Sequence, residues 1–384
     1  MMCTCTGMGL YASVADSAFR FSEAIHARKK GITRKGDFAA AWIDCKDTDN
    51  KYIEIGLAAA AEAISDAGIA PEYIAGNPRV GLVIGSSLGP LPILEDYING
   101  IADESCLPKA MMNAMCDALC ERYKIAGPTM TLTNTCVSGI SAIAAGRLLL
   151  QEDEADVCIV GGIEVICDLF MRGLESLNAL SSKNELKPFA LDRDGIIPGE
   201  GAAFMVLRKE KTSENSYGVI RGVSISNDAT HLTAPDREGR GLIQAVKEAM
   251  YEARVEPNEI SAVFCGGTGT AYNDSMQAKA IQSIWSYGPE QPGKIPVTSV
   301  KPLVGHTLGA SGILESISIF LMMKSRMLLP IAEHYEVDEE MAGLPLAHSA
   351  SEMDIRNAVL LSSGFSGVNG ALVLGSPDVQ KERR

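Results

Sequence analysis

The chain has 384 residues, of which 46% are hydrophobic and 21% are charged, and its formal net charge at pH 7 is −14. At roughly 150 residues per domain, this length fits two or three domain equivalents with a sizeable core. So acidic a surface argues against binding the phosphate backbone of nucleic acids, which needs a basic face. The longest apolar run, Ile313–Met323, is interrupted by Glu315 and Ser316 and falls short of the roughly 18 residues of a membrane span.

The ten cysteines are scattered along the chain and fall well below the density of a disulfide scaffold. The pairs Cys3–Cys5 and Cys116–Cys120 lack a second Cys or His pair at zinc-site spacing, so we expect no metal. The N-terminal letters MMCTCTGMGL lack the basic start and long apolar stretch of a secretory signal. We therefore expect a cytoplasmic protein that binds neither membranes nor nucleic acid, with most cysteines packed as small hydrophobic residues.

Strand and helix signals alternate along the chain, which favours an α/β architecture. In the first half, we expect strands at Arg79–Gly89, Thr129–Thr135, Asp156–Glu164 and Ala202–Leu207, and a helix at Val137–Leu150. In the second half, we expect strands at Ile260–Thr270, Lys294–Val300 and Asn357–Ser366, and a helix at Gly309–Met323.

The second half repeats the pattern of the first at offsets of roughly 170 to 200 residues, which indicates an architectural repeat. We expect two α/β halves, residues 1–215 and 216–384, packed as one rigid body. Their strand-end loops would then meet at a shared junction, where ligands bind in α/β folds.

Three loops at this junction carry candidate chemistry. Cys136, in TNTCVSGISAIAAG, lies where a strand meets a helix N-terminus, whose partial positive charge would lower the thiol pKa. Alone, it is either a nucleophile or a packed small residue. His306, in KPLVGHTLGASG, occupies the corresponding loop of the second half, as a structural hydrogen-bonding group or as an acyl-transfer partner. The loop Gly364–Gly370 offers backbone N–H groups for an oxyanion hole, or is a plain tight turn.

Six motifs together resemble the β-ketoacyl-acyl-carrier-protein synthases, over nearly the whole chain. They are TCVSG, PFALDRDGIIPGEGA, SNDATHLTAPDREGRG, GGTGTAYND, KPLVGHTLGASG and GFSGVNG, in the order and spacing of that family. The resemblance implies a thiolase-like fold, in which two pseudo-repeated α/β halves pack in αβαβα layers. It also implies an acyl chain carried on a cysteine, decarboxylation of a malonyl group on an acyl carrier protein, and Claisen condensation of the two.

The resemblance also assigns roles by motif. Cys136 is similar to the family's nucleophile and His306 to its second active-site histidine. Lys301 resembles the supporting lysine and Glu315 the structural glutamate.

Three further residues resemble those around the entrance of the family's site. Phe365 corresponds to the gating phenylalanine, whose N–H forms the oxyanion hole with that of Cys136. Thr268 and Thr270 resemble the threonines of the phosphopantetheine channel. No metal or organic cofactor is implied, because the phosphopantetheine arrives on the carrier protein.

The pattern fails at the family's first histidine, directly before GTGT, where this chain has Gly266. Loss of one preorganised donor typically lowers a rate by about 10²–10³. Cys265 would point to the opposite face of a strand and is no obvious substitute. No other histidine plainly restores the pair: His26, His231, His334 and His348. Three other positions depart from the family pattern. Gln277 stands where the family has an acidic residue, Leu361-Ser362-Ser363 replaces the family's Asn-Ser-Phe, and Ser366 replaces a glycine.

Three functions remain open. The first is a condensing enzyme with impaired decarboxylation. The second is a chain-length-factor-like subunit that pairs with a complete ketosynthase, although such subunits usually lose the cysteine. The third is a Cys–His acyltransferase or thioester hydrolase. We expect an acyl carrier protein as partner, a dimer with itself or with a complete ketosynthase, and Arg and Lys clustered near the pocket mouth against the overall charge.

Overall fold

The computed structural model describes residues 3–45, 50–209, 216–287, 294–331 and 335–377. Its centre is a ten-stranded sheet in the order β10-β9-β13-β14-β8-β1-β7-β6-β4-β5. The strands are β1 (Cys3–Ala12), β4 (Val80–Gly85), β5 (Thr129–Leu132), β6 (Val157–Glu164), β7 (Gly201–Arg208), β8 (Gly218–Asn227), β9 (Ala262–Phe264), β10 (Val297–Thr298), β13 (Asn357–Ser363) and β14 (Val368–Gly375).

The sheet consists of two runs of five strands with the same connectivity. In β5-β4-β6-β7-β1 and in β10-β9-β13-β14-β8, the first three strands are parallel, and the last two pair antiparallel with their neighbours. The runs join where Cys3–Cys5 pairs with Gly218–Ile220. The predicted domain boundary between residues 215 and 216 adjoins residues 210–215, outside the described part of the chain, and stays a prediction.

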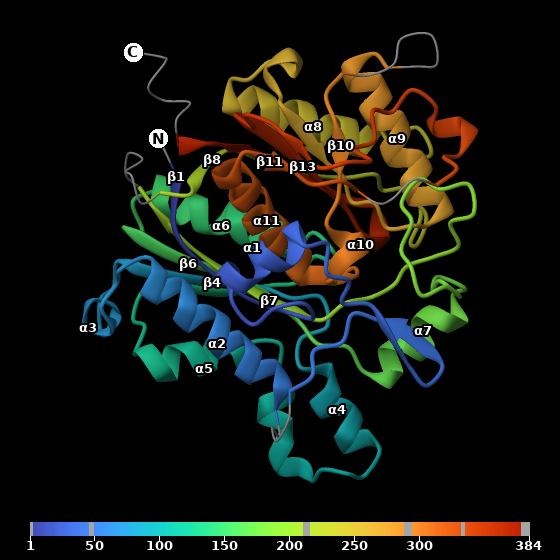
Figure 1. Ribbon diagram of the computed structural model, residues 1–384. Helices are drawn as coiled ribbons and strands as arrows, with labels where there is room; N and C mark the ends of the chain where they lie inside the picture. Colours follow the sequence, from blue (N-terminus) through green and yellow to red (C-terminus); the bar gives the residue numbers. More distant parts are fainter. Residues whose placement is uncertain (1–2, 46–49, 210–215, 288–293, 332–334, 378–384) are drawn as a thin grey trace.

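Helices separate and cover the two runs in five layers (Figure 1). Helices α2 (Lys51–Asp66) and α5 (Ala114–Tyr123) cover the outer face of the first run, and α8 (Arg240–Ala253) and α9 (Ala271–Trp285) that of the second. Between the runs lie α6 (Ser138–Gln151) and α11 (Ser311–Ser325). The thiolase-like α/β fold expected from the motifs is thereby confirmed.

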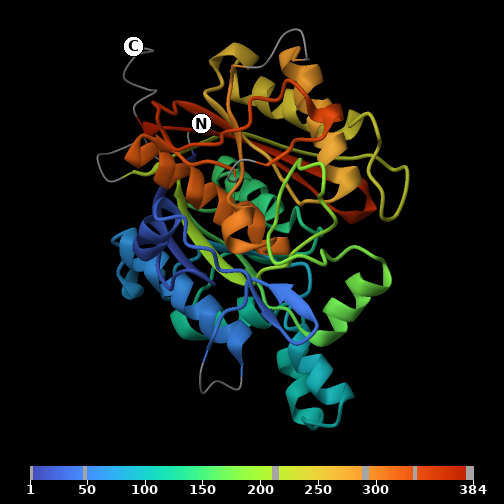
Figure 2. The same cartoon turned by 45° about the vertical axis from the view of Figure 1, so that its right-hand side comes forward.

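The remaining elements lie at the ends and edges of these layers. They are α1 (Ala18–His26), α3 (Pro71–Ile74), α4 (Leu91–Ile98), α7 (Asp168–Ser176), α10 (Lys301–Val304), the pairs β2–β3 (Thr33–Lys35, Phe38–Ala40) and β11–β12 (Met327–Leu328, Ser351–Glu352), and the 3₁₀ segments η1 (Glu104–Ala110), η2 (Pro257–Glu259), η3 (Leu308–Ala310), η4 (Glu339–Met341) and η5 (Phe365–Gly367). Helix α4 and η1 project from the body (Figures 1 and 2).

The α11 region is longer than the sequence indicated. With η3, it forms an apolar stretch, Leu308–Ser325, of 18 residues, which satisfies the length and composition of a membrane span. This corrects the expectation that no run reaches that length. Because 89% of the stretch is buried inside the protein, it is a core helix, and Ser316 and Ser318 donate their hydroxyls to backbone carbonyls one turn back.

The two central helices meet through glycines. A Cβ atom on Gly139 of α6 would lie 2.9 Å from the carbonyl oxygen of Gly309, and one on Gly312 of α11 would lie 2.6 Å from the backbone nitrogen of Ile140. Only glycine permits this separation. The contact sets the N-terminus of α6, with Cys136, beside the loop that carries His306 into α11.

Candidate active site

A cavity of about 1270 Å³ opens where the loops of the two halves meet. Five of the residues that the motifs singled out line this one space: Cys136, Thr268, Thr270, His306 and Phe365. The other two, Lys301 and Glu315, lie buried nearby. The structure therefore brings together residues that are up to 229 positions apart in the sequence.

Cys136 sits in the turn between β5 and α6, after Thr135, whose φ of 49° makes a sharp bend. The residue keeps partial exposure toward the cavity. Burial of the sulfur raises the pKa of the Cys136 thiol to about 12, although the positive charge of Lys301 lowers it. The predicted lowering of the pKa by the helix N-terminus is therefore wrong, because desolvation of the thiolate is the larger effect.

His306 is buried, and hydrogen bonds fix its tautomer. The N–H of Leu308 donates to Nδ1 over 3.3 Å, and the Ser311 hydroxyl lies 3.2 Å from the same nitrogen. Burial, with a smaller contribution from Lys301, holds the pKa of His306 well below its usual value. The imidazole is therefore neutral, with its proton on Nε2, and it can donate one hydrogen bond to a substrate oxygen.

Lys301, at the start of α10, forms a buried ion pair with Glu315 of α11. Their side chains are 2% and 5% exposed, so the two charges are shielded from water. Removing either partner from such a pair is strongly destabilising, because the other charge stays buried. The ion pair thus holds the Lys301 ammonium in one place, where its charge lowers the pKa of both Cys136 and His306.

Thr268 and Thr270 belong to a loop whose conformation is fixed by hydrogen bonds to the carboxylate of Asp274. Asp274, buried at the start of α9, accepts the N–H groups of Thr268 and Gly269 over 3.0 and 3.2 Å, and that of Phe189 over 2.9 Å. The hydroxyls of Thr268 and Thr270 are 3.1 Å apart. Burial raises the pKa of Asp274 to about 6.

Phe365 also lines the cavity and is 36% exposed. The next residue, Ser366, has a φ of 68°, a conformation that usually favours glycine. Its N–H donates to the Leu232 carbonyl over 2.7 Å, which ties this loop to the segment that follows β8.

Gly266 is buried, and its N–H donates to Oε1 of Gln277 over 2.8 Å. Among the described residues, the cavity wall holds one histidine besides His306, namely His231 near Leu232. Its Nδ1 accepts the N–H groups of Thr233 and Ala234. The other histidines lie elsewhere, at His26 and His348, or outside the described residues, at His334.

Glu164, at the end of β6, is a residue that the sequence did not single out. It is fully buried and accepts four hydrogen bonds, from the Ser86 hydroxyl (2.5 Å) and the N–H groups of Ser87 (2.9 Å), Leu88 (3.0 Å) and Gly309 (2.9 Å). It therefore joins the loop after β4 to the start of α11. An acidic residue ending an apolar strand, DVCIVGGIE, is the sequence signal that could have found it.

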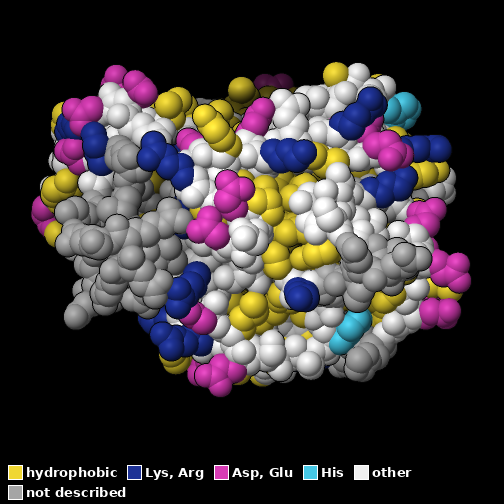
Figure 3. Space-filling view, turned by 90° about the horizontal axis from the view of Figure 1, so that it is seen from above, with side chains coloured by type: hydrophobic (Ala, Val, Ile, Leu, Met, Phe, Trp, Pro, Cys, Tyr) yellow, Lys and Arg dark blue, Asp and Glu magenta, His cyan; other side chains and the backbone are white. Residues whose placement is uncertain are grey.

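The cavity wall carries charges of both signs. Three arginines contribute: Arg193 is paired with Asp338, Arg240 is paired with Asp236, and Arg237 is exposed. Four acidic residues line the same space: Asp194, Asp228, Asp236 and Glu238. On the face seen in Figure 3, basic and acidic side chains are likewise interspersed around a hydrophobic area. The clustering of Arg and Lys expected at the mouth is therefore not seen among the described residues that line the cavity.

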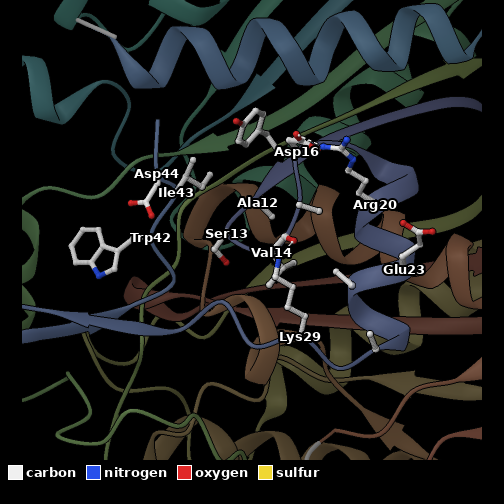
Figure 4. Close-up of a pocket in the computed structure, with 14 residues that line it drawn as sticks. Ala12, Ser13, Val14, Asp16, Arg20, Glu23, Lys29, Trp42, Ile43 and Asp44 are labelled. Atoms are coloured by element: carbon white, nitrogen blue, oxygen red, sulfur yellow. Dashed lines mark hydrogen bonds and ion pairs between the residues drawn. The ribbon is translucent and has the colours of Figure 1, made fainter. Parts of the chain in front are cut away.

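A second cavity, of about 570 Å³, lies between β1, α1 and the segment at Trp42 (Figure 4). Its charged side chains are largely satisfied within the protein: Arg20 pairs with Asp16, and Lys29 donates to the Val14 carbonyl. It contains none of the residues singled out from the motifs. Within the described ranges, no cluster of three or more His, Cys, Asp or Glu side chains could hold a metal.

Comparisons with known proteins agree with the motif pattern. Residues 35–213 match the N-terminal domain of beta-ketoacyl synthases, and residues 217–334 match the C-terminal domain. The chain belongs to the beta-ketoacyl synthase family. It is 27% identical over 406 residues to 3-oxoacyl-[acyl-carrier-protein] synthase 2 of Coxiella burnetii, covering 96% of this chain and 97% of that protein.

Two further relatives show the breadth of this family. A Streptomyces cyaneus protein, whose name places it among polyketide beta-ketoacyl synthases, is 30% identical (86% of this chain, 83% of that protein). The mitochondrial 3-oxoacyl-[acyl-carrier-protein] synthase of Arabidopsis thaliana is 29% identical (89% and 78%).

Solved structures share the fold at lower identity. A ketosynthase in complex with its type II polyketide acyl-carrier protein matches with a TM-score of 0.89 and 22% identity (98% of this chain, 99% of that chain). A ketosynthase in complex with its chain length factor, from Xenorhabdus doucetiae, matches with a TM-score of 0.87 and 24% identity (98% of each chain). Family membership makes the cavity the candidate active site of a beta-ketoacyl synthase.

The raised pKa of Cys136 predicts how its reactivity depends on pH. Because only the thiolate is nucleophilic, alkylation of Cys136 by iodoacetamide should rise about tenfold per pH unit from 7 to 10, with no plateau. Peptide mass spectrometry of the intact chain, labelled for short times, measures this rate at Cys136 alone. Free cysteine, measured in parallel, levels off near its pKa of about 8.5. A plateau at or below pH 8 would contradict the buried-thiol geometry.

The position of Glu164 predicts that its charge affects the site beyond stability. In Glu164→Gln, one amide NH₂ must face an N–H or hydroxyl donor, which typically costs about 1–3 kcal/mol of unfolding free energy. Because the loops beside Cys136 and His306 would shift, alkylation of Cys136 at pH 8 should also change by about tenfold or more.

Glu62→Gln is the matched control, since Glu62 also accepts two backbone N–H groups, those of Leu10 and Ala18. It should lower the melting temperature without changing the rate at Cys136. Equal effects of the two variants on that rate would show that Glu164 has no special link to the site.

Proposed function

We propose that this beta-ketoacyl synthase transfers an acyl group from an acyl carrier protein to Cys136 and condenses it with a malonyl unit, with decarboxylation impaired at Gly266. The observation that carries the proposal is the single cavity lined by Cys136, His306, Thr268 and Thr270. A free small-molecule hydrolase would have no use for two threonines that resemble those of the family's phosphopantetheine channel.

The first half-reaction is thioester exchange. The Cys136 sulfur bonds to the acyl carbon, the bond from that carbon to the phosphopantetheine sulfur breaks, and the thiol proton passes to the departing phosphopantetheine sulfur. The N–H groups of Cys136 and Phe365 would stabilise the oxyanion that forms between these events. Because Cys136 is a thiol at neutral pH, this step requires the proton to leave as the new bond forms.

The second half-reaction needs charge stabilisation on the malonyl thioester. Loss of CO₂ leaves an enolate, whose carbon attacks the acyl group on Cys136 and releases the sulfur, which is then reprotonated. The neutral His306 can donate its Nε2–H to the enolate oxygen. With glycine at 266, the second imidazole of the family pattern is missing, and we expect decarboxylation to be slower by about 10²–10³.

The deciding assay incubates the purified chain with acyl-carrier and malonyl-carrier thioesters and follows intact mass and CO₂ release. We expect acylation of the parent chain, none in Cys136→Ala, and about 10²–10³ slower turnover in His306→Ala. Carbon–carbon bond formation by the chain alone supports the proposal. Acylation followed only by hydrolysis would make it a thioester hydrolase, and unchanged mass with Cys136 reduced would refute the acyl-transfer role.

A paired subunit is the second candidate, favoured by the exposed edge of the sheet. Strand β5 is the last strand of its run, and its outer edge has no neighbouring strand in the described part of the chain. The projecting segment α4–η1 exposes Ile98 (64%), Ile101 (74%) and Met111 (59%) nearby in the sequence. We propose that the chain dimerises through β5, with itself or with a complete ketosynthase, in the cytoplasm.

A lysine placed on the edge strand β5 tests whether the chain dimerises through this strand. The parent chain should elute at about twice its 40.8 kDa in light scattering, or co-purify with a co-expressed ketosynthase that retains both histidines. Thr129→Lys, on the exposed start of β5, should shift the population toward monomer by about tenfold or more in Kd, because an edge lysine blocks strand pairing. Thr33→Lys, on the exposed strand β2, should change nothing. A monomeric parent with no partner recovered would end the proposal.

A further inference from the structure

Thr135, the residue before Cys136, has an unusual backbone and an unusual side chain. Its φ of 49° lies in the left-handed region, which a β-branched residue rarely occupies. Its hydroxyl is buried without a hydrogen-bond partner among the described residues. Both features cost stability, and such costs persist where the surrounding structure imposes them, above all at functional sites. Thr135 also lines the cavity, beside the nucleophile.

Hydrogen bonds to its carbonyl hold Thr135 in this conformation. The hydroxyls of Ser87 and Ser138 each donate to the Thr135 carbonyl oxygen over 2.6 Å, and the Ser138 N–H donates to it over 3.1 Å. The Asn134 N–H donates in turn to the Ser138 hydroxyl over 2.8 Å. The turn before α6 is thus fixed by its own polar groups, and this backbone sets the direction of the Thr135 side chain.

The Thr135 side chain packs against Gly364, the residue before Phe365. A Cβ atom on Gly364 would lie 2.0 Å from the Thr135 hydroxyl oxygen, 3.1 Å from the Thr135 Cβ and 3.2 Å from the backbone nitrogen of Cys136. The φ of Gly364 is −128°, which any residue can adopt, so the backbone itself does not require glycine. Because a β-branched side chain is stiff about its Cα–Cβ bond, Thr135 is what leaves no room for a larger residue.

This contact lies between the two residues that adjoin the proposed oxyanion hole. Cys136 follows Thr135 in the chain, and Phe365 follows Gly364. The N–H groups of Cys136 and Phe365 are the proposed donors to the thioester oxygen. The loop is tied to the nucleophile once more at the end of β13, where the Ser362 hydroxyl donates to the Cys136 carbonyl over 3.2 Å. The separation of the two N–H groups therefore depends on how closely Thr135 and Gly364 approach.

We propose that Thr135 is a positioning residue for acyl transfer. Its side chain is a spacer that holds the loop of Gly364 and Phe365 at the distance from Cys136 at which both N–H groups reach one thioester oxygen. Because the shape of the side chain does this, its hydroxyl needs no partner. The inference rests on the proposed acyl-transfer function, since it concerns the oxygen of the bound thioester.

Two reactions of the same sulfur separate this role from a general effect on Cys136. Acylation by a thioester develops an oxyanion, whereas alkylation by iodoacetamide does not. Thr135→Ala should lower the maximal single-turnover rate of acylation by about tenfold or more, with the carrier concentration at half-maximal rate unchanged. Its alkylation rate should stay within about twofold of the parent. Equal losses in both reactions would overturn the proposal, because Thr135 would then act on the nucleophile itself.

Thr135→Val keeps the shape of the side chain and removes the hydroxyl. Because this hydroxyl is unpaired, the variant should melt at the parental temperature or up to about 3 °C higher, with acylation within about twofold of the parent. Thr131→Ala is the matched control for the truncation, since Thr131 lies on the same strand β5 and is not among the residues that line the cavity. It should change neither rate. Loss of acylation in Thr135→Val would overturn the spacer role, because the hydroxyl would then be the active group.

A double variant tests the contact without reference to activity. Gly364→Ala should lower the melting temperature by roughly 2–8 °C, because the new methyl group overlaps the Thr135 hydroxyl. In Gly364→Ala with Thr135→Ala, the methyl group enters the space that the hydroxyl leaves. The double variant should therefore lose less than the sum of the two single shifts. Additive shifts would refute the contact.

Failure of the proposed function and failure of this inference give different results. A parent chain that no acyl-carrier thioester acylates at Cys136 refutes the proposed function, and the role of Thr135 falls with it. A parent chain that is acylated, with the rate unchanged in Thr135→Ala, refutes the role of Thr135 alone.

Discussion

The buried carboxylate of Glu164 is the constraint on which the geometry of the site depends. Four donors from two distant loops converge on it. One of these loops also contacts the residue before Cys136, because the Ser87 hydroxyl donates to the Thr135 carbonyl over 2.6 Å. The other loop continues from His306 into α11. A single buried carboxylate thus fixes the position of the turn that carries Cys136 relative to the loop that carries His306, and its four hydrogen bonds offset the cost of burying it.

Close backbone packing complements this electrostatic link. The contact of α6 with α11 is made by glycines, so the separation of the two helix starts is set by main-chain atoms and not by adaptable side chains. Within this rigid frame, the chain departs from its family at 266, 277 and 366. Of these three, Ser366 lines the cavity, whereas Gly266 and Gln277 are buried and hydrogen-bonded to each other. The frame that presents Cys136 and His306 to the cavity is kept.

The sequence predicted the fold, and five of the residues that its motifs singled out line the cavity, because the order of the motifs along the chain can be read directly. The prediction of a lowered pKa for Cys136 was wrong. The helix N-terminus beside Cys136 can be predicted from the sequence, whereas the burial of its sulfur cannot. Glu164 was missed because its four donors come from positions 86–88 and 309, which only the folded chain brings together. The relation of Gln277 to Gly266 required the orientation of α9, which no spacing rule supplies.

The high pKa of the Cys136 thiol has a consequence for the protein between turnovers. Hydrogen peroxide oxidises the thiolate and not the thiol, so a sulfur that remains protonated at neutral pH resists conversion to sulfenic acid. A cysteine held in this form stays reduced under oxidative conditions that would modify a thiolate. The burial that slows reaction of Cys136 with electrophiles therefore also protects its sulfur from oxidation.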